Sequence, residues 1–191
     1  MSGADFPTLS FDSVDKWEEY LAKNHETISG VWLKFFKKNS GVKTISYAQA
    51  LDVALCYGWI DSQLKPFDDK AYLQKFSPRR TKSMWSKRNR EHIARLIKEK
   101  RMQPSGMKQV IDAKKDGRWD NAYGSPSEMK IPADFLKELA KNPKAEIFFK
   151  TLNKSNTYAV AWRLHNAKKP ETRQRRIKKF IEMFSKDEKL Y

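Results

Sequence analysis

Apolar and polar residues alternate along the N-terminal half of the chain with two different periods. Val14, Trp17 and Leu21 recur at helical spacing, which predicts an amphipathic helix over residues 13–24. Residues 31–38 are rich in aromatic and β-branched side chains and are typical of a strand. The chain therefore begins with a mixture of helical and extended segments.

A central helix and a hairpin are predicted next. Ser46 and Gln49 have the spacing of a capping box, and the segment after them is apolar on nearly every side, so we expect a buried helix that ends at Gly58. Residues 59–66 and 72–78 are two extended segments separated by a short polar turn, which predicts an antiparallel hairpin. Together with the earlier strand, this hairpin makes a small sheet.

Two amphipathic helices are expected after the hairpin, one from Ser83 and one from Pro104. The first should present a packed face and an opposite cationic face. The residues expected on the buried faces are Trp85, Ile93, Leu96 and Ile97 in the first helix, and Met107, Val110 and Ile111 in the second.

The composition changes at residues 120–131, which are poor in apolar side chains and typical of a connecting loop. We therefore expect two domains, residues 1–123 with the small sheet and residues 124–191 built only from helices. The fold class that follows is α+β and helix-dominated, a small antiparallel-containing sheet packed with helices and followed by a helical C-terminal domain. The helices expected in the second domain cover residues 132–141, 143–152, 155–166 and 170–185.

The positive charge of the chain is concentrated in two short stretches. The 191 residues include 39 Lys and Arg against 23 Asp and Glu, a formal net charge of +16. Residues 79–101 hold 10 basic and 2 acidic residues, and residues 163–179 hold 8 basic and 1 acidic residue. The rest of the chain is close to neutral, so these stretches indicate a surface that meets an anionic ligand or partner.

Several functional classes are disfavoured by composition. No apolar run is long enough to cross a bilayer and no export signal is recognisable, so we expect a soluble, cytoplasmic protein. Cys56 is the single cysteine, and the three histidines lack metal-ligand spacing. No glycine-rich phosphate loop is present either. We therefore expect no metal and no cofactor, assign no catalytic residue, and leave enzymatic activity and oligomeric state open.

Four ordered motifs stand out along the chain: ALDVALCYGWIDS at residues 50–62, FSPRRTKSMWS at 76–86, DGRW at 116–119 and AKKPETRQRRI at 167–177. Together they resemble the YdeI/OmpD-associated family, also called the bacteriocin-protection family. The resemblance spans almost the whole chain, and the helical part from about Pro132 to Met183 looks like the domain for which the family is named. It implies a role in resistance to bacteriocins or cationic peptides and implies no catalytic mechanism.

The first basic stretch contains the sharpest candidate site. Its residues surround the start of a predicted helix, where backbone N–H groups, hydroxyls and guanidinium groups can converge on a phosphate or carboxylate. The alternative is that the two arginines pair with acidic residues of the hairpin, such as Asp61 or Asp68, while Trp85 belongs to the core. The candidate anion-binding residues are Arg79, Arg80, Lys82, Ser83 and Ser86.

A second group of polar and aromatic residues follows the central helix. Asp61 can bind a polar ligand or act as a base, or it can simply anchor the backbone or one of the two arginines. The residues expected to line a cleft here are Trp59, Asp61, Ser62 and Trp85.

The second basic stretch surrounds the N-terminus of the last helix, where positive charge opposes the helix dipole and favours a compensating anion. The candidate residues are Lys168, Lys169, Arg173 and Arg176. The alternative is a solvated face on which Arg173 or Arg176 pairs with acidic residues of the neighbouring domain.

Three functions remain after these exclusions. The first is a stress-associated protein that acts through an anionic partner or surface, as the family resemblance implies. The second is an enzyme or sensor for a small phosphorylated or carboxylated metabolite. The third is weak binding to the nucleic-acid backbone, without base readout.

Overall fold

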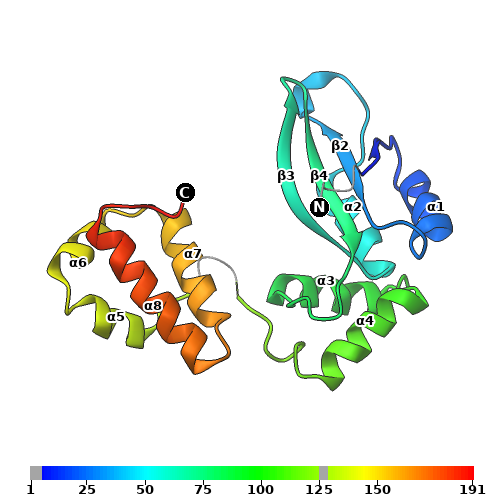
Figure 1. Ribbon diagram of the computed structural model, residues 1–191. Coiled ribbons are helices and arrows are strands. Elements are labelled where there is room, and N and C mark those ends of the chain that lie inside the picture. The colour runs from blue at the N-terminus through cyan, green and yellow to red at the C-terminus, as the bar shows by residue number, and fades with distance from the viewer. Residues whose placement is uncertain (1–5, 125–128) are drawn as a thin grey trace. The chain divides into compact units, whose positions relative to one another are not determined.

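The computed structural model describes residues 6–124 and 129–191, and the chain divides into two compact units, Met1–Tyr123 and Gly124–Tyr191 (Figure 1). Each unit has its own hydrophobic core. The described residues form eight α-helices, one 3-10 helix and a four-stranded mixed sheet. The predicted helix-dominated α+β class is therefore confirmed.

All four strands belong to the first unit and lie in the order β1-β2-β4-β3. The predicted hairpin is present, because β3 and β4 are antiparallel neighbours, and β4 also pairs antiparallel with β2. The strand β1 runs parallel to β2 and was not predicted, because two residues are too short to show a period. The strands are β1 (Thr8–Leu9), β2 (Val31–Phe36), β3 (Trp59–Asp68) and β4 (Ala71–Pro78).

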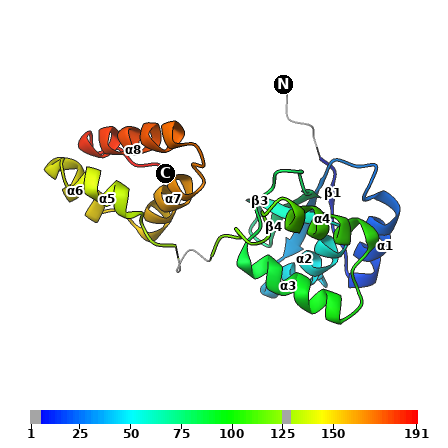
Figure 2. The same cartoon turned by 90° about the horizontal axis from the view of Figure 1, so that it is seen from below.

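The helices of this unit pack around α2, which contacts α1, α3, α4 and β3 and lies at the centre of the unit in Figure 2. Trp17 of α1 joins the core through its ring, which lies 6.5 Å from that of Trp59 and 6.0 Å from that of Phe76. The helices are α1 (Val14–Asn24), α2 (Tyr47–Cys56), α3 (Lys87–Lys98) and α4 (Pro104–Lys115), with the short 3-10 helix η1 (Lys38–Ser40) after β2.

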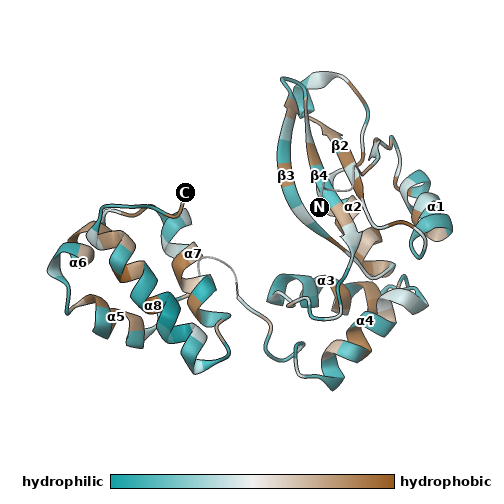
Figure 3. Cartoon of the chain, viewed as in Figure 1, coloured by the Kyte–Doolittle hydropathy of each residue, from teal (hydrophilic) through white to brown (hydrophobic). Residues whose placement is uncertain are grey.

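The two ends of α2 follow the sequence signals. The Ser46 hydroxyl accepts from the Gln49 amide, and the Gln49 side chain accepts from the Ser46 amide, so the predicted capping box is confirmed. Gly58 follows the helix with a φ of 76°, a left-handed conformation that glycine adopts without steric cost. Figure 3 shows α2 as largely apolar, in keeping with its central position.

Four details of the predicted helices are wrong. α3 begins at Lys87 rather than Ser83, and Trp85 precedes the helix instead of lying on its packed face. Ile111 is 58% exposed, because α4 turns Gly106, Val110 and Ala113 toward the core. Ile97 is likewise exposed, at the edge of the buried face that Ile93 and Leu96 form.

The described residues of the second unit form helices and connecting loops, without a strand. Its core is aromatic, with the Phe180 ring 6.3 Å from that of Phe135 and 6.1 Å from that of Phe184. Buried Asn156 joins the end of the chain to this unit, because its side-chain oxygen accepts from the backbone amides of Leu190 and Tyr191. The helices are α5 (Ala133–Leu139), α6 (Pro143–Lys150), α7 (Lys154–His165) and α8 (Pro170–Ser185).

Among the described residues, no helix combines the length and the hydropathy that a membrane span requires.

Candidate functional site

Arg79 lies at the end of β4 with its side chain inside the first unit, only 5% exposed. Its Nη2 donates to the Met84 carbonyl at 2.8 Å, and the guanidinium stacks 3.8 Å from the centroid of the Trp85 ring. Its Nε has no hydrogen-bond partner among the described residues. This guanidinium therefore holds the loop that follows β4, and it is not displayed to solvent.

Burial changes the acidity of that guanidinium. It lowers the pKa of Arg79 to about 10, while the nearby side chains of Tyr123 and Asp61 act in the opposite direction. Arg118 adds to the lowering because it is also a cation. Arg79 remains protonated at neutral pH, so the loop is built around a buried positive charge that contacts no carboxylate of the described residues.

The hydroxyl oxygens of Ser83 and Ser86 in this loop accept hydrogen bonds from backbone amides. Ser83 Oγ accepts from the Arg80 amide at 3.1 Å, and Ser86 Oγ caps α3 by accepting from the Asn89 amide at 3.1 Å. The Lys87 amide donates to the Tyr123 carbonyl. Several donors and acceptors expected to face an anion therefore serve the start of the helix instead.

Arg118 lies in the segment after α4 and also holds this loop. It belongs to neither basic stretch, so the sequence analysis did not identify it. Its Nη1 donates to the Ser83 carbonyl at 3.0 Å, and its Nε pairs with Asp116. Trp119 packs edge-on against Trp85 with ring centroids 5.0 Å apart. The DGRW motif of residues 116–119 is thus explained by contacts within the unit.

Asp61 lies on the face of the sheet that carries Phe76, its partner in β4. Its Oδ2 accepts from the Tyr47 hydroxyl at 2.9 Å. Burial, with the charge and hydrogen bond of Asp61, raises the pKa of Tyr47 above its ordinary value, so the phenol stays protonated and remains a donor. The partner of Asp61 is therefore a tyrosine from α2, rather than Arg79 or Arg80.

The other residues expected to line a cleft differ in burial. Trp59 is buried and its Nε1 donates to the His25 carbonyl at 3.1 Å, and Trp85 is buried beneath Arg79. Ser62 is exposed on β3. Of the candidate anion-binding residues Arg79, Arg80 and Ser86, Arg80 has an exposed side chain, whereas the side chains of the other two form hydrogen bonds within the unit.

The rest of the first basic stretch divides into engaged and unengaged cations. Arg90 donates to the Trp119 carbonyl, and Arg95 pairs with Asp52 and Glu99. Arg101 also lies near Glu99. In the first basic stretch, the exposed cations that form no ion pair with any described residue are Arg80, Lys82, Arg88, Lys98 and Lys100.

A shallow pocket of about 480 Å³ lies on this cationic side of α3. It is lined by Lys87, Arg90, Glu91, Ala94 and Trp119. The indole of Trp119 forms its apolar wall, and the lysine and arginine supply positive charge on either side of a single carboxylate.

The second basic stretch uses its arginines to complete α7. Arg173 binds both carboxylate oxygens of Asp134 and donates to the Leu164 carbonyl at 2.7 Å. Arg176 donates to the Arg163 carbonyl. Both carbonyls lie in the last turn of α7, where the Leu164 carbonyl also accepts from the Ala167 amide, so the two arginines add donors to the C-terminal end of the helix. The acidic partner of Arg173 belongs to the same unit.

Lys168 and Lys169, at the start of α8, are exposed and form no ion pair within the described residues. Arg175, Lys178 and Lys179 are likewise exposed and without an ion pair there. The predicted anion-binding residues thus include lysines that face solvent and arginines that hold the fold. The two basic stretches belong to different units of the chain.

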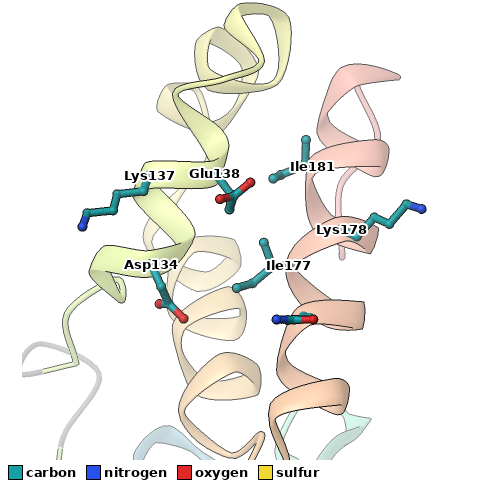
Figure 4. Close-up of a pocket in the computed structure, with 7 residues that line it drawn as sticks. Asp134, Lys137, Glu138, Ile177, Lys178 and Ile181 are labelled. Atoms are coloured by element: carbon teal, nitrogen blue, oxygen red, sulfur yellow. The ribbon is translucent and has the colours of Figure 1, made fainter.

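A groove of about 600 Å³ separates α5 and α8 in the second unit. Figure 4 shows Ile177 and Ile181 of α8 facing α5, while Lys137 and Lys178 point away from the gap. Asp134 and Glu138 provide acidic groups on the α5 side. The groove is apolar at its base and carries charge of both signs at its rim.

The described residues contain no group of three or more His, Cys, Asp or Glu side chains that could hold a metal ion. Cys56 is buried and burial raises its pKa to about 11, so its thiol is a poor nucleophile. His92 Nδ1 lies 2.8 Å from Asp52, and the same carboxylate binds Arg95. This cluster joins α2 to α3, and sequence analysis missed it because its members lie 40 residues apart.

The fold and its exposed cations define a two-unit, helix-rich α+β protein with basic surfaces. Comparison with protein families gives one match in each unit. Residues 9–109 match a domain of unknown function (DUF8412), and residues 128–187 match the family described as bacteriocin-protection, YdeI or OmpD-associated. The first match covers more than half of the chain, so the chain belongs to that family, while its residues 128–187 are similar to the bacteriocin-protection family.

The family matches limit the resemblance to the bacteriocin-protection family to the C-terminal part of the chain. The predicted resemblance of the C-terminal helices to the bacteriocin-protection family is confirmed over residues 128–187, whereas the motifs at residues 50–62 and 76–86 fall in the region matched by the other family. No curated protein and no solved structure matches the chain significantly.

Proposed function

We propose that this protein is a stress-protection protein that binds an anionic partner through the exposed cations of its basic stretches, without catalysing a reaction. One observation carries the proposal. After the internal hydrogen bonds and ion pairs are assigned, Arg88 and Lys98 remain exposed on α3, with Arg80 and Lys82 in the loop before it. The printed description of the C-terminal family supplies the link to bacteriocin protection.

The sign of the charge decides how protection works. A protein of net charge +16 repels cationic peptides that come within the Debye length of about 8 Å at cellular salt, so it is poorly suited to capture them. An anionic partner is attracted by the same field. We therefore propose an indirect role, exerted from the cytoplasm, in which the bound anionic partner and not the peptide is the ligand.

Binding to polyanions at several salt concentrations tests the proposal. Dextran sulfate, duplex DNA and vesicles with anionic lipid serve as probes, each at low and at physiological salt. Affinity should fall steeply as salt rises, because bound cations release counterions. The double substitution Arg88→Glu/Lys98→Glu should weaken binding by about tenfold or more at low salt.

A matched control uses exposed lysines outside the basic stretches. Lys23→Glu/Lys43→Glu changes the net charge by the same amount and should affect binding much less. If no probe binds at low salt, or if both double variants lose the same affinity, the proposed surface is wrong. A strain lacking the gene should also become more sensitive to bacteriocins, and an unchanged sensitivity would remove the protective role.

A further inference from the structure

The sheet of the first unit has a solvent-facing side that differs from an ordinary polar sheet surface. Val31, Leu33 and Phe35 of β2 turn inward and are buried. The alternate residues of the same strand face the other way and are partly exposed. These are Trp32, Lys34 and Phe36, so two of the three solvent-facing positions of β2 are aromatic.

Lysines lie over aromatic rings across this side of the sheet. Lys65 Nζ of β3 lies 4.1 Å from the centroid of the Trp32 ring. Lys34 Nζ lies 4.0 Å from the Phe67 ring and 4.8 Å from the Phe36 ring. Lys75 Nζ lies 3.8 Å from the Phe6 ring, which adds a third lysine at the edge near β1. We call this surface the lysine–aromatic face; it comprises Phe6, Trp32, Lys34, Phe36, Lys65, Phe67 and Lys75.

The pairing of the strands brings these residues together. Trp32 is the partner of Lys75 across β2 and β4, and Lys34 and Lys65 flank Leu73 from opposite sides. Leu73 is buried although it belongs to the solvent-facing side, because the long side chains around it cover it. The face is therefore a continuous layer of rings and ammonium groups.

The charge of the face is almost entirely positive. Asp68 is the one carboxylate that β2, β3 and β4 place on it, at the hairpin end, where it lies 3.7 Å from Lys34. Asp61 points to the opposite side of the sheet with Phe76. None of the three lysines lies in either of the basic stretches, so this face is independent of the cations on α3 and α8.

We propose that the lysine–aromatic face binds single-stranded nucleic acid. Flat rings and cations alternate on the face, just as flat bases and anionic phosphates alternate along a single strand. A base can replace a lysine on a ring, and the displaced ammonium then meets the adjacent phosphate. A duplex keeps its bases stacked inside and presents only phosphates, so it satisfies the lysines but not the rings.

Fluorescence anisotropy on the full-length protein tests this assignment. The probes are a labelled oligothymidylate of about a dozen nucleotides, a duplex of the same length, and vesicles with anionic lipid. At equal salt, the single strand should bind about tenfold or more tightly than the duplex. Equal affinity for both nucleic acids, binding to vesicles alone, or no binding at low salt would overturn the proposal.

Substitutions separate stacking from charge. Phe67 is 51% exposed, so Phe67→Leu keeps an apolar side chain, removes the ring and leaves the core intact. Combined with Trp32→Leu, it should weaken single-strand binding by about tenfold or more. Trp162→Leu, at an exposed tryptophan of the second unit, is the matched control and should change nothing. Wild-type affinity in the double variant would refute the stacking platform.

Two further comparisons keep the result interpretable. Trp32→Leu could lower stability, which a circular dichroism melt would show. In that case Phe67→Leu alone still tests the face, and it should weaken the binding of the single strand by several-fold. Arg88→Glu/Lys98→Glu should weaken the binding of dextran sulfate, duplex DNA and anionic vesicles, whereas the aromatic substitutions should weaken only the binding of the single strand. Failure of one proposal therefore does not imply failure of the other.

Discussion

The guanidinium of Arg79 stacks 3.8 Å from the ring centroid of Trp85, six residues further along the chain. The loop between them reverses direction, with the Ser83 amide donating to the Arg80 carbonyl at 2.8 Å. Because Arg79 Nη2 also binds the Met84 carbonyl, one side chain fixes both the ring and the backbone of the loop. A cation in a basic stretch can thus be part of the core.

The position of Arg79 predicts an order of stability among its substitutions. Arg79→Lys should lower the free energy of unfolding by about 2 kcal/mol, because a compact ammonium loses the planar stacking and is costly to bury. Arg79→Met should cost less, because it removes the buried charge as well as the hydrogen bond. Urea unfolding of both variants measures the difference.

The adjacent arginine provides the control for this series. Arg80 is exposed, so Arg80→Lys should change the free energy of unfolding by less than about 0.5 kcal/mol. Equal costs at the two positions, or a larger cost for Arg79→Met than for Arg79→Lys, would contradict the buried-cation interpretation.

Local signals in the sequence predicted the parts of the fold that depend on a few neighbouring residues. Ser46 and Gln49 marked the start of α2, and Gly58 marked its end, because capping and a left-handed turn are satisfied within one helical turn. The start of α3 was placed too early because Ser83 and Ser86 both suit an N-cap. Only the contact of Trp85 with Arg79 and Trp119 decides between them.

The candidate site depended on contacts that no local pattern reveals. The number of basic residues in a stretch does not distinguish Arg79, Arg173 and Arg176 from their exposed neighbours. It could not show that their partners are backbone carbonyls from another turn or helix. The lysine–aromatic face was missed for a related reason, because strand register brings Lys65 of β3 over Trp32 of β2.

The close contact of Gly106 in α4 with the backbone at the end of α2 predicts that a larger residue at this position would clash. A Cβ at this position would lie 2.1 Å from the Cys56 carbonyl oxygen, which belongs to the backbone and cannot move independently. Helix propensity alone favours Gly106→Ala by about 1 kcal/mol, but overpacking against backbone should reverse the sign. We expect a loss of about 3 kcal/mol or more in thermal or urea unfolding.

Ile111 on the same helix is the matched control. Its side chain is mostly exposed, so Ile111→Ala should cost less than about 0.5 kcal/mol. A mild effect of Gly106→Ala would show that α4 can move away from α2 without loss.

Asp134 predicts how the second unit responds to acid. Arg173 holds the pKa of Asp134 below its ordinary value, mainly through their hydrogen bonds. As the pH falls through the ordinary range of an aspartate near 3.8, the unfolded chain takes up a proton before the folded unit does, so the stabilisation from this pair declines. It is complete at neutral pH and lost once the folded carboxyl is also protonated.

The variant Asp134→Asn should therefore be less stable than the wild type at pH 7, by no more than about 1 kcal/mol because the pair is partly exposed. The difference should shrink as the pH is lowered through about 4. Calorimetric melts of the full chain across this range measure it, with Glu146→Gln as the control, since Glu146 pairs with the exposed Lys150 within one helix. A difference that grows on acidification would show that Arg173 does not stabilise the ionised form of Asp134.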